Sequence, residues 1–528
     1  MTDTPPQRGV FGRTLAEVLA VWAVFVAFSL VQATVPGVNE THYLAKSRHV
    51  WLPSWCAGDL FLESSNPHLV FYRTVGWLAS VFEFRDAAVI GRVICLGVLA
   101  WGWVTLSSAA TGRRGRGALS AVLFLTLASM GNWSGEWVVG GVESKVPAYG
   151  LAMAAAGCLI ESRLAAAGLL AGLAVSFHPV VGLWFVLAMA GAAVLAAFGG
   201  LPSPPSRRRQ QLIAAGLFAV ASLPGLVPAA SLLAGADAEL STAAARYQVT
   251  VRLAHHLNPA TFPLAAYRGF ALTLLLLAVL GAIASPRRRW LPAMAGFATL
   301  FAAVGVAVGL SGDLATSDWR VSLLKFYPFR LADVLVPMAA CVGAADLGLR
   351  ALRGDAGRRR RWTPRTLSGS VVFVALAAAA LLIPTRDRDS SRLSPRRRAD
   401  WVETLSWVRR NTPADAVILS TDSQWAVKWY AQREEYANYK DCPQDAESIA
   451  RWRRRRAVMF RWSQAALADR RVTGEELAAF AAETGVTHLL YARGWPVTVR
   501  PDFANDSYRV LRIDQFERPA AASDEPAG

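Results

Sequence analysis

The sequence Gly37-Val38-Asn39-Glu40-Thr41-His42-Tyr43-Leu44 directly follows the first long apolar segment, Leu15 to Val35. That segment is long enough to cross the hydrocarbon core of a bilayer, which takes about 20 residues. An acidic side chain a few residues beyond a membrane span costs desolvation free energy, so the position of Glu40 asks for an explanation. The junction predicts a membrane protein with a polar site at the membrane surface.

The composition of the chain agrees with a membrane protein. Of its 528 residues, 54% are hydrophobic, yet 55 Lys and Arg against 38 Asp and Glu give a formal net charge of +17. In a soluble protein this balance would suggest a nucleic-acid partner. Here repeated apolar runs of about 17–25 residues indicate a bilayer as the solvent, so we expect the arginines to set topology and expect no nucleic-acid partner.

The apolar runs predict a polytopic α-helical membrane protein with about eleven spans. The first span is expected to be retained, because the apolar segment is too long for a signal peptide. Residues 70–84 are too short and too charged for a span and predict an interfacial or re-entrant helix. The predicted spans are 14–36, 86–110, 118–133, 147–161, 164–178, 180–199, 210–233, 264–285, 290–311, 327–350 and 368–384.

The basic loops support this alternation of spans. Short loops rich in Lys and Arg stay on the cytoplasmic side, and with eleven spans they all fall on the side of the N-terminus. An exception follows the last span, where Arg386, Arg388, Arg392 and residues 396–398 lie on the outer side, so ten or twelve spans remain alternatives. The inner loops contain Arg113, Arg114, Arg116, Arg163, residues 207–209, residues 287–289 and Arg358 to Arg361.

The loops on the opposite face carry acids, histidines and further cations. Any one of these residues is most simply a solvated loop residue. Four of them, Glu143, Lys145, Arg330 and Asp333, lie beside or within apolar helices. A solvated loop position does not account for charged residues there. The full set is Glu40, His42, Asp59, Glu63, His68, Glu136, Glu143, Lys145, His178, Arg246, Arg252, His255, His256, Asp318, Arg320, Lys325, Arg330 and Asp333.

The composition changes after about residue 385. Residues 400–410 predict an amphipathic helix with Trp401, Leu405 and Val408 on its apolar face. Residues 416–420 and 486–491 predict buried strands, and a further helix is expected to begin at 423–430. We therefore expect two domains: a transmembrane module at 1–384 with a long first outer loop at 37–85, and a small extracytoplasmic α/β domain at 385–528.

The five cysteines show no C-x-x-C spacing, which argues against a zinc or redox motif. Cys95, Cys158 and Cys341 fall within spans and are expected to be small apolar core residues. Cys56 and Cys442 are both predicted on the outer side, where a disulfide between them is one alternative.

The order of these parts resembles the GT-C superfamily of membrane glycosyltransferases. The resemblance rests on the acidic residue and the amphipathic helix in the first outer loop, and on a C-terminal extracytoplasmic α/β domain. The closest likeness is to a bacterial subgroup, and the stretches that carry it are Asn39-Glu40-Thr41-His42-Tyr43-Leu44, Trp407-Val408-Arg409-Arg410-Asn411-Thr412-Pro413-Ala414-Asp415-Ala416-Val417-Ile418-Leu419, Tyr436-Ala437-Asn438-Tyr439-Lys440-Asp441 and Trp452-Arg453-Arg454-Arg455.

The resemblance implies an inverting glycosyltransferase of the bacterial inner membrane. Its donor would be a polyprenyl-phosphate sugar, and its acceptor an extracytoplasmic lipid, glycan or protein. Many members carry two acidic residues close together in the first outer loop. Here Glu40 stands alone and Asp59 is the next acid, so the resemblance leaves a divalent cation open.

The chemistry of this reaction suggests roles for the polar residues. Glu40 would be the general base that removes the acceptor's proton. The departing lipid phosphate needs cations, for which Lys325 and Arg330 are the first choices and Lys145 and Arg320 the next. Asp333, three residues after Arg330, would hold its guanidinium. The alternative is that Lys325 and Arg330 only extend toward the interface from a helix end.

The other substrate-site candidates have structural alternatives. His42 would orient the acceptor or join a metal site, or else pack beside Tyr43. His178 would take part in a polar cavity, or only begin a helix with its following proline. Glu143 and Lys145 would either line the site or pair with each other.

Two other classes of protein remain open from the sequence. A transporter or flippase of lipid-linked glycans would show internal repeats and polar residues near the membrane midplane. The sequence shows no such repeat, and its polar residues lie toward one face. A catalytically inactive, glycan-binding envelope protein is the other alternative.

Overall fold

The computed structural model describes residues 7–65, 67–129, 132–202, 207–234, 237–353, 364–383, 385, 388–421 and 426–516. The predicted basic run Arg358 to Arg361, Arg386 and the start of the helix expected at 423 lie outside the described residues. The chain divides into two compact units. The first contains residues 1–37, 67–71 and 88–388, and the second contains 38–66, 72–87 and 389–528.

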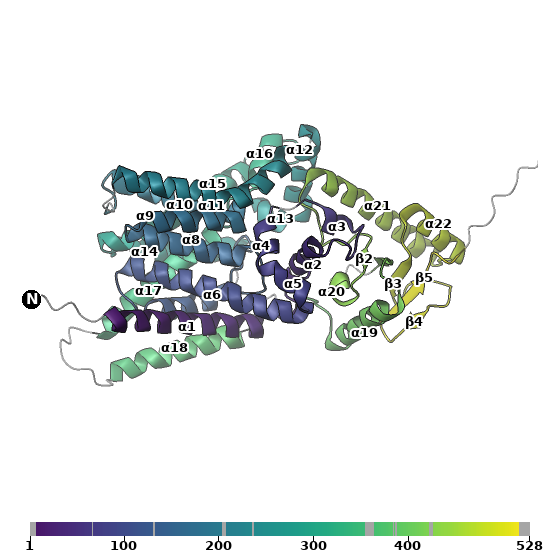
Figure 1. Cartoon of the computed structure of the whole chain (residues 1–528), viewed down its shortest axis with the longest axis horizontal. Coiled ribbons are helices and arrows are strands. Elements are labelled where there is room, and N and C mark those ends of the chain that lie inside the picture. The colour runs from purple at the N-terminus through teal and green to yellow at the C-terminus, as the bar shows by residue number, and fades with distance from the viewer. Residues whose placement is uncertain are drawn as a thin grey trace, which may run out of the picture. The chain divides into compact units, whose positions relative to one another are not determined.

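The first unit is a bundle of apolar helices, drawn from purple to green in Figure 1. Neighbouring helices pack along their lengths, for example α8 on α9, α9 on α11 and α14 on α17. The helices of the bundle are α1 (Gln7–Gln32), α6 (Phe84–Thr111), α7 (Gly117–Ser129), α8 (Lys145–Ile160), α9 (Leu164–Phe177), α10 (Pro179–Ala197), α11 (Arg208–Ala234), α14 (Leu264–Ala282), α15 (Trp290–Leu310), α17 (Ala332–Arg353) and α18 (Pro364–Leu382).

All eleven predicted spans are helical, but the structure supports a smaller number as full spans. Within the described part of the chain, seven helices are long and apolar enough to cross a membrane: α1, α6, α10, α11, α14, α15 and α17. Helices α7, α8 and α9 are apolar but shorter. A multi-span membrane protein is therefore confirmed, while the count of eleven stays a prediction.

Close packing of the bundle depends on small residues. A Cβ atom on Gly102 of α6 would overlap the carbonyl oxygen of Gly150 in α8, and one on Gly150 would lie 2.6 Å from the carbonyl oxygen of Val98. Apolar side chains gain little by leaving a lipid environment, so membrane helices associate through such close backbone contact. These two glycines hold α6 and α8 together.

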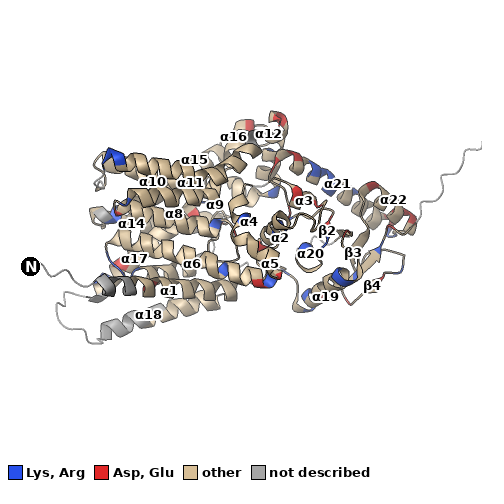
Figure 2. Ribbon diagram, viewed as in Figure 1, with Lys and Arg blue, Asp and Glu red and all other residues tan. Residues whose placement is uncertain are grey.

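Short helical elements lie in the segments that connect the ends of the bundle helices. Figure 2 shows charged residues concentrated toward the helix ends and connections, with apolar residues between them. The connections contain α4 (Leu69–Arg73), α12 (Ala238–Tyr247), the π-helical η2 (Gln248–Arg252), α13 (Ala254–Leu257), η3 (Pro259–Thr261), η4 (Pro286–Arg289) and α16 (Asp318–Leu324).

The second unit contains a five-stranded mixed sheet in the order β2-β1-β3-β5-β4. Strand β1 pairs in parallel with β2 and β3, while β5 is antiparallel to β3 and β4. The small α/β fold predicted for the C-terminal part is confirmed. The strands are β1 (Val417–Ser420), β2 (Glu434–Glu435), β3 (His488–Ala492), β4 (Phe503–Ala504) and β5 (Tyr508–Arg512).

The helices around this sheet begin at capping residues that fix their boundaries. Helix α19 (Pro395–Asn411) begins after Ser394, whose side chain accepts from a backbone N–H, and buries Trp401, Leu405 and Val408 as predicted. Helix α21 (Ala446–Asp469) begins after Asp445, and α22 (Gly474–Thr484) begins with a complete capping box. Helix α20 (Val427–Tyr430) is the described part of the helix predicted at 423–430.

The predicted first outer loop is largely helical. Residues 38–66 and 72–87 belong to the second unit and form α2 (Glu40–Trp51), α3 (Leu60–Glu63), η1 (Val75–Trp77) and α5 (Leu78–Val81). Glu40 is therefore the first residue of a helix within the segment predicted as the first outer loop, and it is fully buried. A carboxylate is favourable there because helix N-termini carry partial positive charge.

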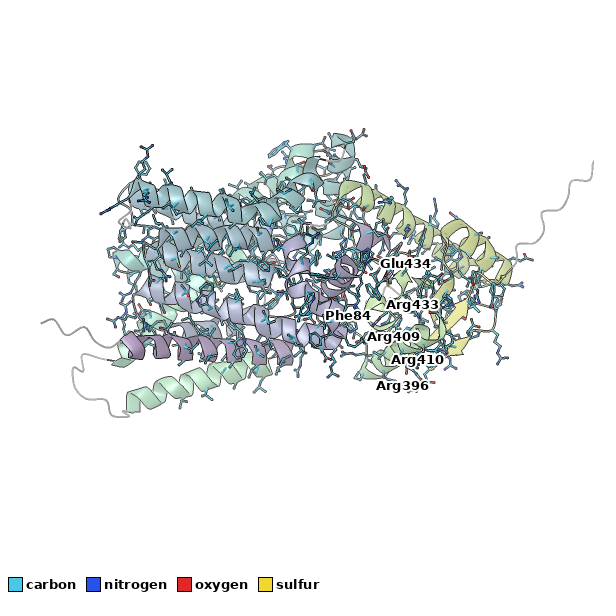
Figure 3. The ribbon with its side chains drawn as sticks, in the orientation of Figure 1. Phe84, Arg396, Arg409, Arg410, Arg433 and Glu434 are labelled. Carbon is cyan, nitrogen blue, oxygen red and sulfur yellow. The ribbon has the colours of Figure 1, made fainter. Side chains whose placement is uncertain are left out.

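The arginines that follow the last span take part in folding the second unit (Figure 3). Arg396 pairs with Asp506, and Arg409 pairs with Glu83 at 3.0 Å. Arg433 donates to the carbonyl oxygens of Arg409 and Thr412, each at 2.8 Å. Of the basic residues that appeared as an exception to the topology rule, Arg396 therefore has an acidic partner within this unit.

All five cysteines are free thiols. The disulfide considered between Cys56 and Cys442 is not formed. Burial raises the pKa of the Cys56 thiol to about 12, which keeps it protonated and unreactive.

Candidate functional site

The candidate site in the first unit is built on Asp333, the second residue of α17. Its carboxylate accepts hydrogen bonds from the backbone N–H groups of Trp133, Ser134 and Glu136, at 3.2, 3.0 and 3.2 Å, and from the Ser134 hydroxyl. A carboxylate this deep in apolar protein needs such partners. Asp333 fixes the loop after α7 and does not hold the guanidinium of Arg330, so that prediction is wrong.

The anchored loop presents Glu136 to two cations. Its Oε2 atom lies 3.1 Å from Nε of Arg330 and 3.5 Å from Nζ of Lys145. Lys145 also lies 3.2 Å from Glu143, so the ion pair that the sequence left as an alternative is formed. Glu136 and Lys145 are buried, and the result is a cluster of two cations and two carboxylates at one end of the helices.

Arg330 is positioned from two further sides. Its guanidinium carbon lies 3.9 Å from the centre of the Tyr327 ring, and Nη1 lies 3.4 Å from Nε2 of His178. The other ring nitrogen of His178 faces the N–H of Val181 at 3.3 Å, at the start of α10. A neutral imidazole has one acceptor nitrogen, so only one of these two long contacts is a hydrogen bond at a time.

The histidines near Arg330 are held neutral. The rings of His68 and His178 lie in contact, with centres 4.5 Å apart and planes tilted by 45°. Burial, with the positive charge of Arg330 adding to it, lowers the pKa of His68 to about 3, and burial, His68 and Arg330 lower the pKa of His178 well below its usual value. A proton on either ring would add positive charge beside Arg330, so neither serves as an acid at neutral pH.

Two other predicted cations lie in the same unit, outside the Glu136 cluster. Lys325 follows α16, is partly buried with Nζ 5.3 Å from the centre of the Phe326 ring, and burial lowers its pKa. Arg320 is half-buried and donates to the carbonyl oxygen of Ser311 at 3.3 Å. Lys325 forms no ion pair within the described residues, so its charge is available to an anion.

The sequence did not single out Glu136, Tyr149 and His256 as site residues. Tyr149 is buried in α8, and His256 contacts the carbonyl oxygen of Ser134 at 2.6 Å. The available signal was the polar, glycine-rich segment 132–145 between two apolar helices. This segment contains two acids, and Asp333, about 200 residues away, fixes the loop so that Glu136 reaches Arg330. The distance along the sequence between these residues gave no sign of that contact.

Asp333→Asn is expected to loosen this loop. An amide has one acceptor oxygen and directs its NH2 group toward backbone donors, so two or more of the present hydrogen bonds are lost, at about 1–3 kcal/mol of unfolding free energy. Hydrogen exchange of residues 132–136 should rise in the variant. Asp313→Asn, at a surface turn, is the matched control and should leave that exchange unchanged. Equal exchange in wild type and Asp333→Asn would contradict the anchoring role.

The predicted residues of the second unit are divided between packing and ion pairing. His42 packs against Tyr43 and Phe61, with ring centres 5.2 and 6.1 Å away. Asp59 caps α3 by accepting from the N–H groups of Phe61 and Leu62, both at 3.0 Å, and accepts from the N–H of Glu435. In these contacts His42 packs within the second unit, and Asp59 caps a helix and binds the sheet.

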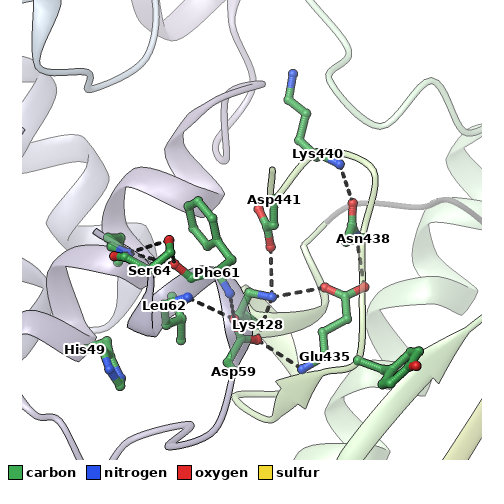
Figure 4. A network of polar contacts seen from close by, with 12 residues as sticks. His49, Asp59, Phe61, Leu62, Ser64, Lys428, Glu435, Asn438, Lys440 and Asp441 are labelled. Atoms are coloured by element: carbon green, nitrogen blue, oxygen red, sulfur yellow. Dashed lines mark hydrogen bonds and ion pairs between the residues drawn. The ribbon is translucent and has the colours of Figure 1, made fainter. Parts of the chain in front are cut away.

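Asp59 also belongs to a buried charge cluster around Lys428 (Figure 4). The ammonium of Lys428 lies 2.9 Å from Asp59, 3.3 Å from Glu435 and 2.8 Å from Asp441. Burial opposes its charged form, but the three carboxylates together hold the pKa of Lys428 well above its usual value. The cluster joins the segment before α3 to the sheet, and Thr41, next to Glu40, lines a small cavity beside it.

A second buried lysine supports the same segment. Lys46 of α2 donates to the carbonyl oxygens of Phe61 and Ser64 and to the Ser64 hydroxyl, the last at 3.1 Å. Burial lowers the pKa of Lys46 to about 8. In the described ranges, no group of three or more His, Cys, Asp or Glu residues is arranged to hold a metal ion. The ammonium of Lys428 already occupies the centre of its three carboxylates.

Glu434 should make the second unit less stable as pH rises. Burial, with Asp59 adding to it, raises the pKa of Glu434 from 4.5 to about 7, so the folded state binds a proton that the unfolded state releases above pH 4.5. Stability is therefore greatest at low pH and falls as pH rises through 7, by about 1–2 kcal/mol after solvent screening.

Glu434→Gln tests this pH dependence. The variant should flatten the decline of the unfolding midpoint between pH 5 and 8, measured on the full protein. Part of the decline remains, because burial also raises the pKa of Glu435 to about 7. Glu483→Gln, on an exposed position of α22, should follow wild type. An unchanged slope in Glu434→Gln would contradict the assignment.

Comparison with known proteins identifies solved structures with a similar fold. A family model described as a domain of unknown function (DUF6798) matches residues 399–459. No curated protein matches the chain. The chain resembles the arabinofuranosyltransferase AftD from Mycobacteria at 13% identity and a TM-score of 0.50, with 97% of this chain and 42% of that chain covered.

Two further solved structures are similar over most of the chain. ArnT from Cupriavidus metallidurans has 11% identity and a TM-score of 0.48, with 97% of this chain and 99% of that chain covered. The archaeal oligosaccharyltransferase AglB from Archaeoglobus fulgidus has 14% identity and a TM-score of 0.42, with 91% and 69% covered. At these identities the likeness concerns the fold, which is GT-C-like as the sequence indicated.

Proposed function

We propose that the protein is a glycosyltransferase of the bacterial inner membrane. It moves a sugar from a polyprenyl-phosphate donor to a lipid, glycan or protein acceptor on the extracytoplasmic side, where its α/β domain also lies. The observation that supports this proposal best is the pair of cations Arg330 and Lys145, which Glu136 holds together at one end of the apolar helices of a GT-C-like fold, with Lys325 as a further cation of the same unit. A lipid phosphate needs both features: cations at the membrane boundary and an apolar path for its chain.

In this proposal Arg330 and Lys325 bind the donor phosphate. Glu136 binds the Nε edge of the Arg330 guanidinium, and the Tyr327 ring lies against its face. These two contacts fix the orientation of the N–H groups that remain. A guanidinium held in this way suits a phosphate, which it binds through two parallel hydrogen bonds. Lys145, Glu143 and His178 keep Arg330 and Glu136 in place, and Arg320 contributes positive charge from the surface.

The proposed reaction is a single displacement at the anomeric carbon. Glu40 accepts the proton of the acceptor as the acceptor atom attacks that carbon. The bond between the carbon and the phosphate oxygen breaks, and the polyprenyl phosphate leaves with the electron pair and the negative charge that Arg330 and Lys325 stabilise. His42 belongs to the acceptor side of this proposal, while Asp59 is left to its structural contacts. No step of it requires a metal ion.

The function is tested by mass spectrometry of lipid-linked sugars and envelope glycans, with and without the protein. Loss of the protein should remove one sugar modification and raise the amount of its polyprenyl-phosphate sugar. Wild type should restore the modification, and Arg330→Ala should not. If the deletion changes no glycan and no lipid-linked sugar, the proposed activity is wrong.

A further inference from the structure

Helix α17 ends in a second buried charge cluster. Asp346 is almost fully buried, with Oδ1 3.2 Å from Nε of Arg116 and Oδ2 3.0 Å from Nε of Arg288, and it also pairs with Arg350. Three guanidinium groups therefore share one carboxylate, which leaves two formal positive charges. The buried Nε–H of Arg350 donates no hydrogen bond within the described residues. The cluster has capacity for a further anion.

An apolar groove leads away from these arginines. It lies between the end of α6 and helices α14, α15 and α17, and Arg288, Asp346 and Arg350 form its polar end. Its enclosed volume is small, about 60 Å³, and the groove is open along one side. The walls away from the charges are formed by Leu277, Leu280, Ile283, Leu291, Val342 and Leu347.

One wall of the groove belongs to a helix that faces lipid. Helix α14 is a candidate span whose outward side chains are largely exposed, including Leu272 at 67% and Leu275 at 62%. Ile283, which lines the groove, is itself 62% exposed. Side chains of this kind on a membrane helix contact acyl chains. The groove is therefore reachable from the bilayer.

We propose that this groove binds one anionic phospholipid. Its phosphate contacts Arg288 and Arg350, and an acyl chain lies along the apolar walls. The excess of two positive charges favours a lipid with net negative charge over a zwitterionic one, because the latter brings a cation of its own. Arg116 and Arg288 belong to loops on the side of the basic, cytoplasmic segments, so the lipid comes from that leaflet.

This site is separate from the proposed donor phosphate site. Asp333 and Asp346 are 13 residues apart on α17, which corresponds to about 20 Å along the helix axis. The two charge clusters therefore lie at opposite ends of the same helix. The lipid site rests on its own contacts and does not depend on the proposed transferase activity.

The test is lipid binding by the purified full-length protein, measured by native mass spectrometry. The probes are phosphatidylglycerol, phosphatidylcholine and a polyprenyl phosphate. The first variant is Arg288→Gln with Arg350→Gln, in which Arg116 still pairs with Asp346. The second is Ala284→Trp, which fills the groove and keeps every charge. Arg209→Gln, on the exposed first turn of α11, is the surface control.

We expect one phosphatidylglycerol to remain bound to wild type and to Arg209→Gln, with at least tenfold weaker binding in both groove variants. Phosphatidylcholine should not be retained. Equal phosphatidylglycerol binding in wild type and the two groove variants would overturn the proposal. Displacement of the bound phosphatidylglycerol by polyprenyl phosphate would also overturn it, since the groove would then be a site for the donor lipid. Thermal unfolding checks that each variant is folded.

Discussion

Replacing Glu40 by Gln should reduce sugar transfer by about 10²–10⁴-fold, the usual contribution of a general base. Gln keeps the size and the hydrogen-bonding shape of the side chain but cannot take up the acceptor's proton. Glu40 is fully buried at the start of α2, and its neighbour Thr41 lines a cavity that also contains Asn438 and Asp441. The measurement is transfer by the purified protein from a polyprenyl-phosphate sugar, with donor binding followed separately.

The control for this experiment is Glu63→Gln. Glu63 is an exposed acid of the same unit, 2.6 Å from the N–H of Gly58, and its replacement should leave transfer near wild type. Donor binding should be unchanged in Glu40→Gln, because the base acts on the acceptor. Full activity in a folded Glu40→Gln protein would remove Glu40 from the mechanism.

Glu136→Gln distinguishes between the two buried acids. Its Oε2 atom is already engaged by Arg330 and Lys145, so this carboxylate is expected to hold cations and not to accept a proton. The variant should weaken donor binding, because Arg330 loses the partner that positions it. If Glu136→Gln instead retained donor binding and lost transfer, while Glu40→Gln remained active, the base would be Glu136.

Replacing Lys428 by Met should destabilise the second unit by about 3–5 kcal/mol. The ammonium is the one cation within 3.3 Å of Asp59, Glu435 and Asp441 in the described part of the chain. Without it, three buried carboxylates repel one another and must take up protons to remain buried. The loss should be largest at high pH and smaller below the ordinary carboxyl pKa. Thermal unfolding of the full protein between about pH 3 and pH 8, a range that spans the ordinary carboxyl pKa, measures it.

A second substitution should partly rescue this variant. Glu435→Gln removes one of the three buried charges, so the double variant Lys428→Met with Glu435→Gln should be more stable than Lys428→Met alone. Lys440→Met is the control, because the Lys440 side chain points away from the carboxylates in Figure 4. If Lys428→Met cost no more stability than Lys440→Met, the cluster would have no role in holding the unit together.

The sequence predicted those parts of the fold that depend on local pattern. The apolar runs became helices, and the buried positions Trp401, Leu405 and Val408 followed from helical spacing in α19. The strands at Val417 and His488 were recognisable because a short apolar run between turn residues has few other structures. Each of these predictions uses information within about 20 residues.

The parts that could not be predicted depend on contacts across the chain. Asp333 was expected to bind Arg330, three residues before it, but the backbone donors of a distant loop satisfy it better. Segment 37–85 looked like a loop because its helices are short. Its partners, including Lys428, lie more than 350 residues further on. Spacing identifies polar residues near a site but does not say which of them meet.

Helix α17 carries a carboxylate near each end, and both are bound by groups from distant parts of the chain. Asp333 is bound by the loop after α7, and Asp346 by Arg116 and Arg288. A single inserted residue between them would rotate one carboxylate by about 100° relative to the other and shift it along the axis. One end would then lose its partners. The number of residues between these two positions is therefore strictly fixed, and α17 should tolerate no change of length between them.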